Sequence, residues 1–398
     1  MLPSEYHFCT YFDRNYLTRG LALYRSLARH CQRPFTLWIL CFDATTYETL
    51  DRLSLPGVRL ISLDQFEAAD PSLRKAKAER SAVEYFWTCT PSLPLYILSH
   101  YPKIDLITYL DADLCFYSDP MPVYSEMGDG SILIVEHRYA PEHAHLAATS
   151  GIYNVELLAF RRDDRGLTCL RWWRARCLEW CYKRIEDGKF GDQKYLDDWP
   201  QRFAGVVALK NVGAGLAPWN AAQYNVRWQD GRINVDGAPL IFYHFHGLKK
   251  IARNAIRPAG HAYRLSSSLI EHLYFPYMDA LREAERDAGV GASLVRGEYD
   301  SGGLRLLPGL LEHRWLLVTP RWLALALWRF GERQHNRLLA GLDAYRCGDL
   351  LTARRMCLVA ALHNPSLLGN RKIMSILART ILRPGQISFL QRLRGRVL

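Results

Sequence analysis

The stretch Ile-Asp-Leu-Ile-Thr-Tyr-Leu-Asp-Ala-Asp, residues 104–113, sets the fold class of this chain. Its first seven residues are mostly aliphatic, aromatic or β-branched, and a turn-like Tyr-Pro-Lys precedes them, which predicts a largely buried strand. The strand ends in Asp111 and Asp113, the only Asp-x-Asp in the sequence. Because the pleat ends there, the two carboxylates can converge on a divalent cation that prefers oxygen ligands. The alternative interpretation is a pair of solvated or helix-capping aspartates at a strand–loop junction.

The first half of the chain alternates strand and helix patterns. Strand-like stretches at residues 6–11, 34–42 and 58–63 are accompanied by helical patterns, the first of them at 18–30. This alternation predicts an α/β domain whose largely parallel sheet binds ligands at the carboxyl ends of its strands. The first strand–helix junction has no glycine-rich fingerprint, which argues against a dinucleotide-binding Rossmann domain and against a P-loop.

The α/β pattern continues to about residue 258. Further strands are expected at 131–136, 155–160, 206–209 and 240–245, with a Trp-rich helix at 168–186. Beyond 258 the strand patterns largely cease.

A second informative cluster is Tyr-His-Phe-His-Gly-Leu-Lys-Lys, residues 243–250. His244 stands at a predicted strand end, Gly247 follows three residues later, and Lys250 three residues after that. This spacing suits a diphosphate: the imidazole can complete a metal shell, the glycine lets the backbone approach oxygens, and the lysine neutralises phosphate charge. The alternative is an ordinary strand–loop–helix junction.

Four motifs occur in a fixed order along the chain. They are Thr-Tyr-Phe-Asp-Arg-Asn-Tyr at 10–16, Tyr-Leu-Asp-Ala-Asp at 109–113, Asp-Gln at 192–193 and His-x-x-Gly-x-x-Lys at 244–250. In this combination the chain resembles the GT-A glycosyltransferases, specifically the retaining galactosyltransferase and glycogenin class, glycosyltransferase family 8.

The chain is similar, more closely still, to the bacterial polysaccharide-cluster enzymes of that class. In those enzymes Glu-Tyr-Phe-Trp-Thr-Cys-Thr-Pro, here 84–91, and Gly-Lys-Phe-Gly-Asp-Gln-Lys-Tyr-Leu, here 188–196, recur. The resemblance covers roughly residues 5–260. It implies a GT-A domain, a Rossmann-like nucleotide-diphospho-sugar transferase fold. The pattern and charge of the remaining residues predict a basic, all-helical C-terminal extension after that domain.

The resemblance also implies roles for individual residues. The implied metal ligands for Mn²⁺ or Mg²⁺ are Asp111, Asp113 and His244. The implied nucleotide-sugar-binding residues are Thr10, Asp13, Asn15, Tyr16, Arg80, Asp111, Gly247 and Lys250. The implied catalytic residues are Gln193 near the anomeric carbon, Asp192 on the donor-sugar hydroxyls, and Asn154.

Two of these assignments depart from the family pattern. The family's Asn-Ala-Gly strand motif stands here as Ser-Gly-Ile-Tyr-Asn-Val at 150–155, so the register of Asn154 is open. The basic residue that usually precedes the Asp-x-Asp has no clear match, and Arg80 is the nearest candidate.

The implied function is metal-dependent transfer of a sugar from a UDP-sugar to a saccharide or lipid-linked acceptor. Retention of configuration and a place in cell-surface polysaccharide or lipopolysaccharide synthesis follow from the same resemblance. One alternative is a phosphatase that uses the Asp-x-Asp; such enzymes of the haloacid dehalogenase type need Thr or Val two residues beyond the second Asp, whereas Leu114 and Cys115 follow here. The other alternative is a non-catalytic helical-repeat adaptor with a degenerate GT-A domain.

The domain organisation follows from length and pattern. A chain of 398 residues with 49% hydrophobic content can form two or three domains. We expect a GT-A domain at 1–260, a helical extension and linker at 261–302, and a basic helical region at 303–398. Within the last, a single tetratricopeptide-like hairpin is expected at about 334–367.

The basic charge of the chain is concentrated in its last quarter. Residues 303–398 hold 16 Lys and Arg against 4 Asp and Glu, whereas residues 1–302 hold 35 against 36. Tryptophans, leucines and arginines interleave at 314–330, which favours an amphipathic helix at a membrane interface over a surface that reads nucleic acid. A helix that packs its tryptophans into a core is the alternative.

The expected location is cytoplasmic, on the inner face of the cell membrane and peripheral to it. The ten cysteines contain no Cys-x-x-Cys pair, which suits a reduced compartment. The first six residues include Glu5 and lack the apolar core of a signal peptide.

The full-length protein is expected to bind anionic liposomes at low salt and to leave them at high salt. Each Lys or Arg near an anionic surface contributes about 1 kcal/mol, and dissolved salt screens this attraction. Co-sedimentation measures the bound fraction, with neutral liposomes as the control. A chain ended at Gly302 should lose the binding yet still hydrolyse UDP-sugar slowly; full-length protein that ignores anionic liposomes at low salt would contradict the membrane role.

Overall fold

The structure of this chain is a computed structural model that describes residues 3–252, 255–260 and 263–289, with scattered residues between 316 and 357. The chain divides into two compact units, one of residues 1–253 and 258–300, the other of residues 254–257 and 301–398. In the second unit the structure pairs β14 (Ala255–Arg257) with β15 (Leu316–Leu317). The linker before residue 303, the basic helical region and the expected hairpin at 334–367 lie, apart from those scattered residues, outside the described part of the chain.

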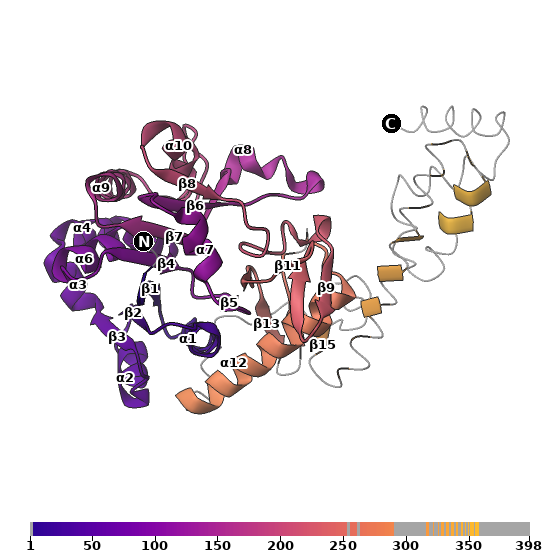
Figure 1. Ribbon diagram of the computed structural model, residues 1–398, viewed down its shortest axis with the longest axis horizontal. Helices are drawn as coiled ribbons and strands as arrows, with labels where there is room; N and C mark the ends of the chain where they lie inside the picture. Colours follow the sequence, from indigo (N-terminus) through magenta and orange to yellow (C-terminus); the bar gives the residue numbers. More distant parts are fainter. Residues whose placement is uncertain are drawn as a thin grey trace, which may run out of the picture. The chain divides into compact units, whose positions relative to one another are not determined.

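A seven-stranded sheet forms the centre of the first unit (Figure 1). Its strands run in the order β3-β2-β1-β4-β7-β6-β8. Every adjacent pair is parallel except those that involve β7, which is antiparallel to both β4 and β6. The bounds are β1 Tyr6–Phe12, β2 Phe35–Cys41, β3 Val58–Ser62, β4 Leu106–Leu110, β6 Ile132–Glu136, β7 Tyr153–Arg161 and β8 Val206–Leu209. The predicted α/β class with a largely parallel sheet is confirmed.

Strand β4 lies in the middle of this sheet, and all five of its residues are buried. Its apolar run has no polar alternation because hydrophobic side chains cover both faces, as expected for a central strand of an α/β sheet. On one face the core includes Leu110 with residues of α1 (Leu17–His30) and α12 (Phe275–Ala288). On the other it includes Ile107 with residues of α6 (Ser92–His100) and α9 (Asp164–Glu179).

The remaining helices are short. They are α2 Ala44–Leu53, α3 Leu63–Ala69, α4 Pro71–Glu79, α5 Ala82–Cys89, α7 Met121–Met127, α8 Leu146–Ser150, α10 Trp199–Arg202 and α11 Ser267–Leu269. Single turns of 3₁₀ helix occur at Pro141–His143, Lys194–Asp198 and Ala221–Gln223, and a π-helical turn at Ile270–Tyr274 leads into α12. Among the helices that the structure describes, none is long and apolar enough to cross a bilayer.

The expected Trp-rich helix at 168–186 differs in both bounds from the observed α9. The helix begins earlier because the Asp163 side chain accepts a hydrogen bond from the Gly166 amide and caps it. It ends at Glu179, and Trp180 is extended. The sequence pattern alone did not show either boundary.

The remaining strands form smaller sheets. The strands are β5 Leu114–Phe116, β9 Val226–Gln229, β10 Arg232–Val235, β11 Ala238–Pro239, β12 Phe242–His244, β13 Lys249–Ala252, β14 Ala255–Arg257 and β15 Leu316–Leu317. Strands β9, β10 and β11 form an antiparallel sheet that the sequence analysis did not predict. The strand expected at 240–245 is β12, which pairs with β5 instead of joining the central sheet.

Candidate functional site

Asp111 and Asp113 lie in the tight connection between β4 and β5. The Asp111 amide donates to the Glu156 carbonyl of the neighbouring strand β7 at 2.9 Å, which extends the strand pairing by one residue. The Leu114 amide donates a hydrogen bond to the Asp111 carbonyl at 3.2 Å, which closes a tight turn. The Tyr109 hydroxyl donates to Asp111 Oδ1 at 2.9 Å and holds that carboxylate. The loop therefore holds both aspartates just beyond the carboxyl end of β4.

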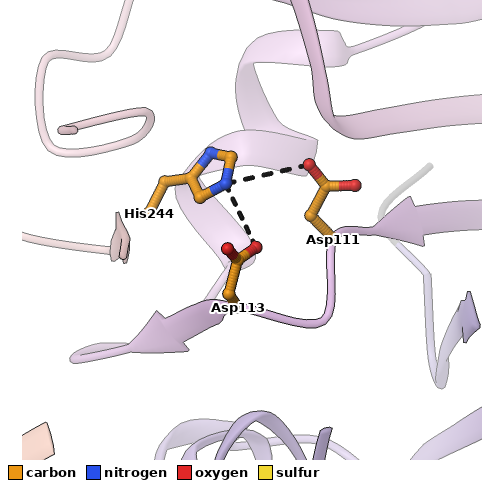
Figure 2. A group of neighbouring side chains, drawn as sticks. All are labelled: Asp111, Asp113 and His244. Carbon is orange, nitrogen blue, oxygen red and sulfur yellow. Dashed lines mark ion pairs between the residues drawn. The ribbon is translucent and has the colours of Figure 1, made fainter. Parts of the chain in front are cut away.

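His244 reaches the two aspartates through the antiparallel pairing of β12 with β5. In this register His244 is opposite Leu114, and the Phe245 amide donates to the Asp113 carbonyl at 3.0 Å. Figure 2 shows the result: His244 Nε2 lies 3.1 Å from Asp113 Oδ1 and 3.8 Å from Asp111 Oδ2. One ligand atom from each residue falls within 4.8 Å of the others. The structure thus brings together the three residues implied as metal ligands.

These three side chains fit a hard divalent cation. Two carboxylate oxygens and one imidazole nitrogen form a donor set that Mn²⁺ or Mg²⁺ accepts. Burial raises the pKa of Asp111, although the His244 charge opposes this. Burial would also raise the pKa of Asp113, but the charge and hydrogen bond of His244, together with the charges of His246 and Arg19, lower that pKa. The cluster carries negative charge that either a proton on His244 or a divalent cation can balance.

Asn154 and Glu156 are two residues apart on β7, so their side chains lie on the same face of the strand. They add polar groups to the site on the Nδ1 side of the His244 ring. Glu156 Oε2 accepts from His244 Nδ1 at 2.7 Å. The Glu156 amide donates to Asn154 Oδ1 at 2.7 Å, and Asn154 Nδ2 lies 2.9 Å from His137 Nε2. Burial lowers the pKa of His137 to about 3, so its ring is neutral. His137 Nδ1 lies 3.2 Å from the Ile152 carbonyl, which leaves Nε2 as the acceptor that orients the Asn154 amide.

Asp192 and Gln193 lie in the segment that follows α9. Burial raises the pKa of Asp192 to about 7; a hydrogen bond from Thr90 opposes the shift, and the Asp111 charge adds to it. These interactions place Asp192 within electrostatic reach of the Asp-x-Asp. Gln193 Nε2 donates to the Ser150 carbonyl at 2.5 Å, which ties the Gln193 amide to the end of α8.

Four of the implied nucleotide-sugar-binding residues lie at the end of β1: Thr10, Asp13, Asn15 and Tyr16. Strand β1 is parallel to β4, with Cys9 opposite Tyr109. Thr10 is fully buried, and its hydroxyl has no hydrogen-bond partner among the residues described. Asp13 accepts from the Asn15 amide at 3.0 Å and from Asn15 Nδ2 at 2.8 Å, so these two residues form a turn before α1. Tyr16 is exposed. All four therefore lie at the sheet edge that also carries Asp111.

Gly247 and Lys250 lie in the segment that follows β12. Gly247 has a φ of +73°, a left-handed conformation that favours glycine. Lys250 Nζ donates to Glu285 Oε1 of α12 at 2.8 Å, so the lysine is held by a carboxylate in this structure. A contact to a diphosphate would require Lys250 to leave Glu285.

Arg19 is a residue of this region that the sequence analysis missed. It lies in the first turn of α1, is 5% exposed, and donates from Nη2 to the Leu248 carbonyl at 3.0 Å. Its positive charge also helps to lower the pKa of Asp113, although burial and His244 have larger effects. An arginine in an amphipathic helix is normally a surface residue, so no local pattern singled it out.

Arg80, implied as a nucleotide-binding residue, hydrogen-bonds to protein groups in this structure. Its guanidinium donates to the Cys177 carbonyl at 2.7 Å and to the Leu178 carbonyl at 2.6 Å, both near the end of α9. It also donates to the Thr88 hydroxyl. The last carbonyls of a helix lack intrahelical partners, and a cation there is favourable. Arg80 thus joins α9 to α5.

Replacing Arg80 by alanine is expected to destabilise the fold without weakening UDP binding. A hydrogen bond to a charged group contributes about 1.5–3 kcal/mol, so the free energy of unfolding should fall by at least about that amount. Chemical denaturation measures stability, and calorimetric titration measures UDP affinity. The control is Arg59→Ala, at an exposed arginine of β3. A stable Arg80→Ala protein with weakened UDP binding would support the nucleotide-binding role instead.

Comparison with known proteins places this chain beside two bacterial proteins. It is 35% identical over 274 residues to uncharacterized protein YfnF of Bacillus subtilis (strain 168), a match that covers 67% of this chain and 89% of YfnF. It is 31% identical over 278 residues to uncharacterized protein YfnD of the same strain, covering 69% of this chain and 88% of YfnD. No family model matches the sequence.

Several solved glycosyltransferase structures resemble the chain at low identity. Galactosyltransferase LgtC in complex with donor and acceptor sugar analogues is 17% identical, with a TM-score of 0.42, over 73% of this chain and 99% of that one. The glycosyltransferase GlyE of Streptococcus pneumoniae TIGR4 is 15% identical, with a TM-score of 0.41, over 76% and 66%. Mouse xyloside xylosyltransferase 1 is 12% identical, with a TM-score of 0.39, over 60% and 97%.

Proposed function

This chain belongs to the protein family of Bacillus subtilis YfnF and YfnD, and we propose that it is a metal-dependent glycosyltransferase of the GT-A type. The proposed reaction moves a sugar from a UDP-sugar to a saccharide or lipid-linked acceptor. The observation that supports it best is the cluster of Asp111, Asp113 and His244 at the carboxyl edge of a parallel sheet. Ligands of such sheets bind at that edge.

The proposed cofactor is Mn²⁺ or Mg²⁺, held by Asp111, Asp113 and His244. When bound, the ion would supply positive charge against the negative charge that develops on a departing diphosphate. A site for a nucleoside diphosphate has to offset that charge, and the cluster without a cation is itself negative. The cation requirement therefore follows from the same three residues.

The segment after β12 would bind the diphosphate. The left-handed conformation of Gly247 lets the backbone approach oxygens, and Lys250 supplies a mobile positive charge. Lys250 now pairs with Glu285, with 16% and 25% of the two side chains exposed. Exchange of the Glu285 carboxylate for a phosphate oxygen keeps the lysine charge paired throughout.

Asp192 and Gln193 would bind the sugar. With a pKa of about 7, the Asp192 carboxyl can accept or donate a hydrogen bond to a sugar hydroxyl near neutral pH. Gln193 is held in place by Ser150, which pre-orients its amide. Asn154 is oriented by His137 and the Glu156 amide in the same way. Retention of the anomeric configuration is part of the proposal through the family resemblance.

The acceptor is proposed to lie at the membrane. The charge of residues 303–398, with 16 basic and 4 acidic side chains, supports attachment to an anionic surface. Glycan precursors on lipid carriers are acceptors of this kind. A role in cell-surface polysaccharide or lipopolysaccharide synthesis is consistent with both features.

Replacing Asp113 by alanine is expected to abolish sugar transfer and slow hydrolysis of the UDP-sugar, since the metal shell loses a carboxylate. Wild-type protein in excess EDTA should behave likewise and recover on addition of Mn²⁺. Release of UDP is the measurement, with a panel of UDP-sugars as donors.

The matched control for this test is Asp105→Ala. Asp105 is an exposed aspartate next to the other end of β4, so its loss should leave turnover unchanged. Full activity of Asp113→Ala, or of wild type in EDTA, would contradict the metal-dependent function.

Replacing Lys250 by alanine is expected to lower turnover more than donor affinity, because its charge matters most as the diphosphate leaves. Loss of one such contact typically costs about 2.7–4 kcal/mol of barrier, which is about 10²–10³ in kcat. Steady-state kinetics separates kcat from KM.

Two further variants separate loss of the Lys250 charge from loss of its ion pair and from a general loss of positive charge. Glu285→Gln removes the same ion pair but keeps the lysine, so it should retain turnover near the wild-type value. Lys249→Ala, at the exposed neighbouring lysine, controls for general loss of positive charge. A Lys250→Ala protein with normal kcat would show that the lysine serves only the packing of α12.

A further inference from the structure

Glu156 lies on the far side of the His244 ring from the two aspartates. Its Oε2 is 2.7 Å from Nδ1 of that ring, while Nε2 faces Asp111 and Asp113. The Glu156 side chain is 1% exposed. The imidazole is therefore clamped between one carboxylate at Nδ1 and two at Nε2.

The same residue also holds Asp111 through its main chain. Strand β7 pairs antiparallel with β4, with Leu157 opposite Leu110, and the next hydrogen bond runs from the Asp111 amide to the Glu156 carbonyl at 2.9 Å. Glu156 thus contacts Asp111 through its backbone and His244 through its carboxylate. Glu156 therefore connects the β4–β5 loop to the end of β12.

The Nδ1 contact determines which tautomer of His244 can bind a cation. A neutral imidazole has one N–H and one lone pair. Because a carboxylate accepts only, a neutral His244 keeps its hydrogen on the Nδ1 atom next to Glu156. A cation between Nε2 and the two aspartates would take the place of the Nε2 hydrogen and bind the lone pair there. Metal-binding histidines commonly donate their second N–H to a carboxylate in this way.

Glu156 is costly for the fold, which argues that packing alone does not explain it. Its second oxygen, Oε1, is buried and has no hydrogen-bond partner among the described residues. Burial of a carboxylate with an unsatisfied oxygen disfavours folding. A Cβ at Gly215 would lie 2.9 Å from Glu156 Oε1 and 2.7 Å from Arg138 Nη2, so the absence of a side chain there lets a guanidinium lie near this carboxylate.

We propose that Glu156 is a positioning residue of the metal centre. It holds the Nδ1–H of His244, so that the Nε2 lone pair faces Asp111 and Asp113, and it completes a carboxylate–histidine–metal triad. The inference rests on the proposed function in one respect, that the cluster binds a divalent cation.

The test is the affinity of the full-length protein for Mn²⁺, with and without UDP. Calorimetric titration or the Mn²⁺ paramagnetic resonance signal measures it in wild type, Glu156→Gln and Glu156→Ala. Loss of the second carboxylate of such a triad typically weakens metal binding about 10–100-fold. Glu156→Ala should show this loss, and Glu156→Gln, which keeps an acceptor oxygen for Nδ1–H, should show a smaller one.

A matched control separates this role from general stability. Glu67 is also buried and accepts hydrogen bonds, from Tyr85 and Lys77, but belongs to α3. Glu67→Gln should leave the Mn²⁺ affinity unchanged. Thermal unfolding without metal checks that each variant is folded, and Glu156→Gln keeps the test valid if Glu156→Ala does not fold.

A double-mutant cycle tests whether Glu156 acts through His244. His244→Ala removes the ligand, so adding Glu156→Gln to it should cause no further loss of Mn²⁺ affinity. Folded Glu156 variants that bind Mn²⁺ as wild type does, or losses that add fully to that of His244→Ala, would overturn the proposal and leave the proposed function intact. A wild-type protein that binds no Mn²⁺ with or without UDP would overturn both.

Discussion

The antiparallel pairing of β5 with β12 is the interaction on which the site depends. Only three residues of each strand take part, yet the register sets Leu114 opposite His244 and delivers the imidazole to the aspartates. The Phe245 amide, bonded to the Asp113 carbonyl, continues this pairing into the loop itself. A slip of one residue would turn His244 to the opposite face. The tight β4–β5 connection therefore carries both carboxylates and also leads into β5, the strand whose pairing with β12 positions His244.

The electrostatics of the site depend on burial. Asp113, Glu156 and His244 are buried. Unpaired charges are unfavourable in the protein interior. Asp113 and Glu156 raise the pKa of His244 well above its ordinary value, even though burial acts in the opposite direction. A proton at this position and a divalent cation are alternative ways to balance the same carboxylates. The negative charge of these buried carboxylates consequently favours the binding of a cation.

Helical elements on the α1 side of the sheet support the loop after β12. Arg19 of α1 holds the Leu248 carbonyl, and Glu285 of α12 holds Lys250. Helix α12 is in turn fastened to the first helices: Arg25 pairs with Asp287, and Arg52 donates to the Ala288 carbonyl at 2.8 Å. The segment that would meet a diphosphate is thus positioned by residues distant in sequence.

The sequence by itself determined the class of fold and the chemistry-bearing motifs. An apolar run that ends in Asp111 and Asp113 predicts a buried strand with carboxylates at its end, and β4 is that strand. His244 was assigned to the same metal site through the resemblance of the ordered motifs to a known family. Local patterns sufficed here, since strand periodicity and strand ends are properties of neighbouring residues.

Only the tertiary structure decided which side chains meet. Glu156 lies within an apolar strand, where a single acidic residue carries no sign of the histidine 88 positions away that it contacts. Arg80 satisfies carbonyls near the end of α9, and Arg19 turns into the fold, although both stand in segments where arginine usually faces water. The antiparallel direction of β7 was likewise outside the reach of the pattern. These outcomes depend on strand pairing and on the burial of charge, which join residues far apart in the chain.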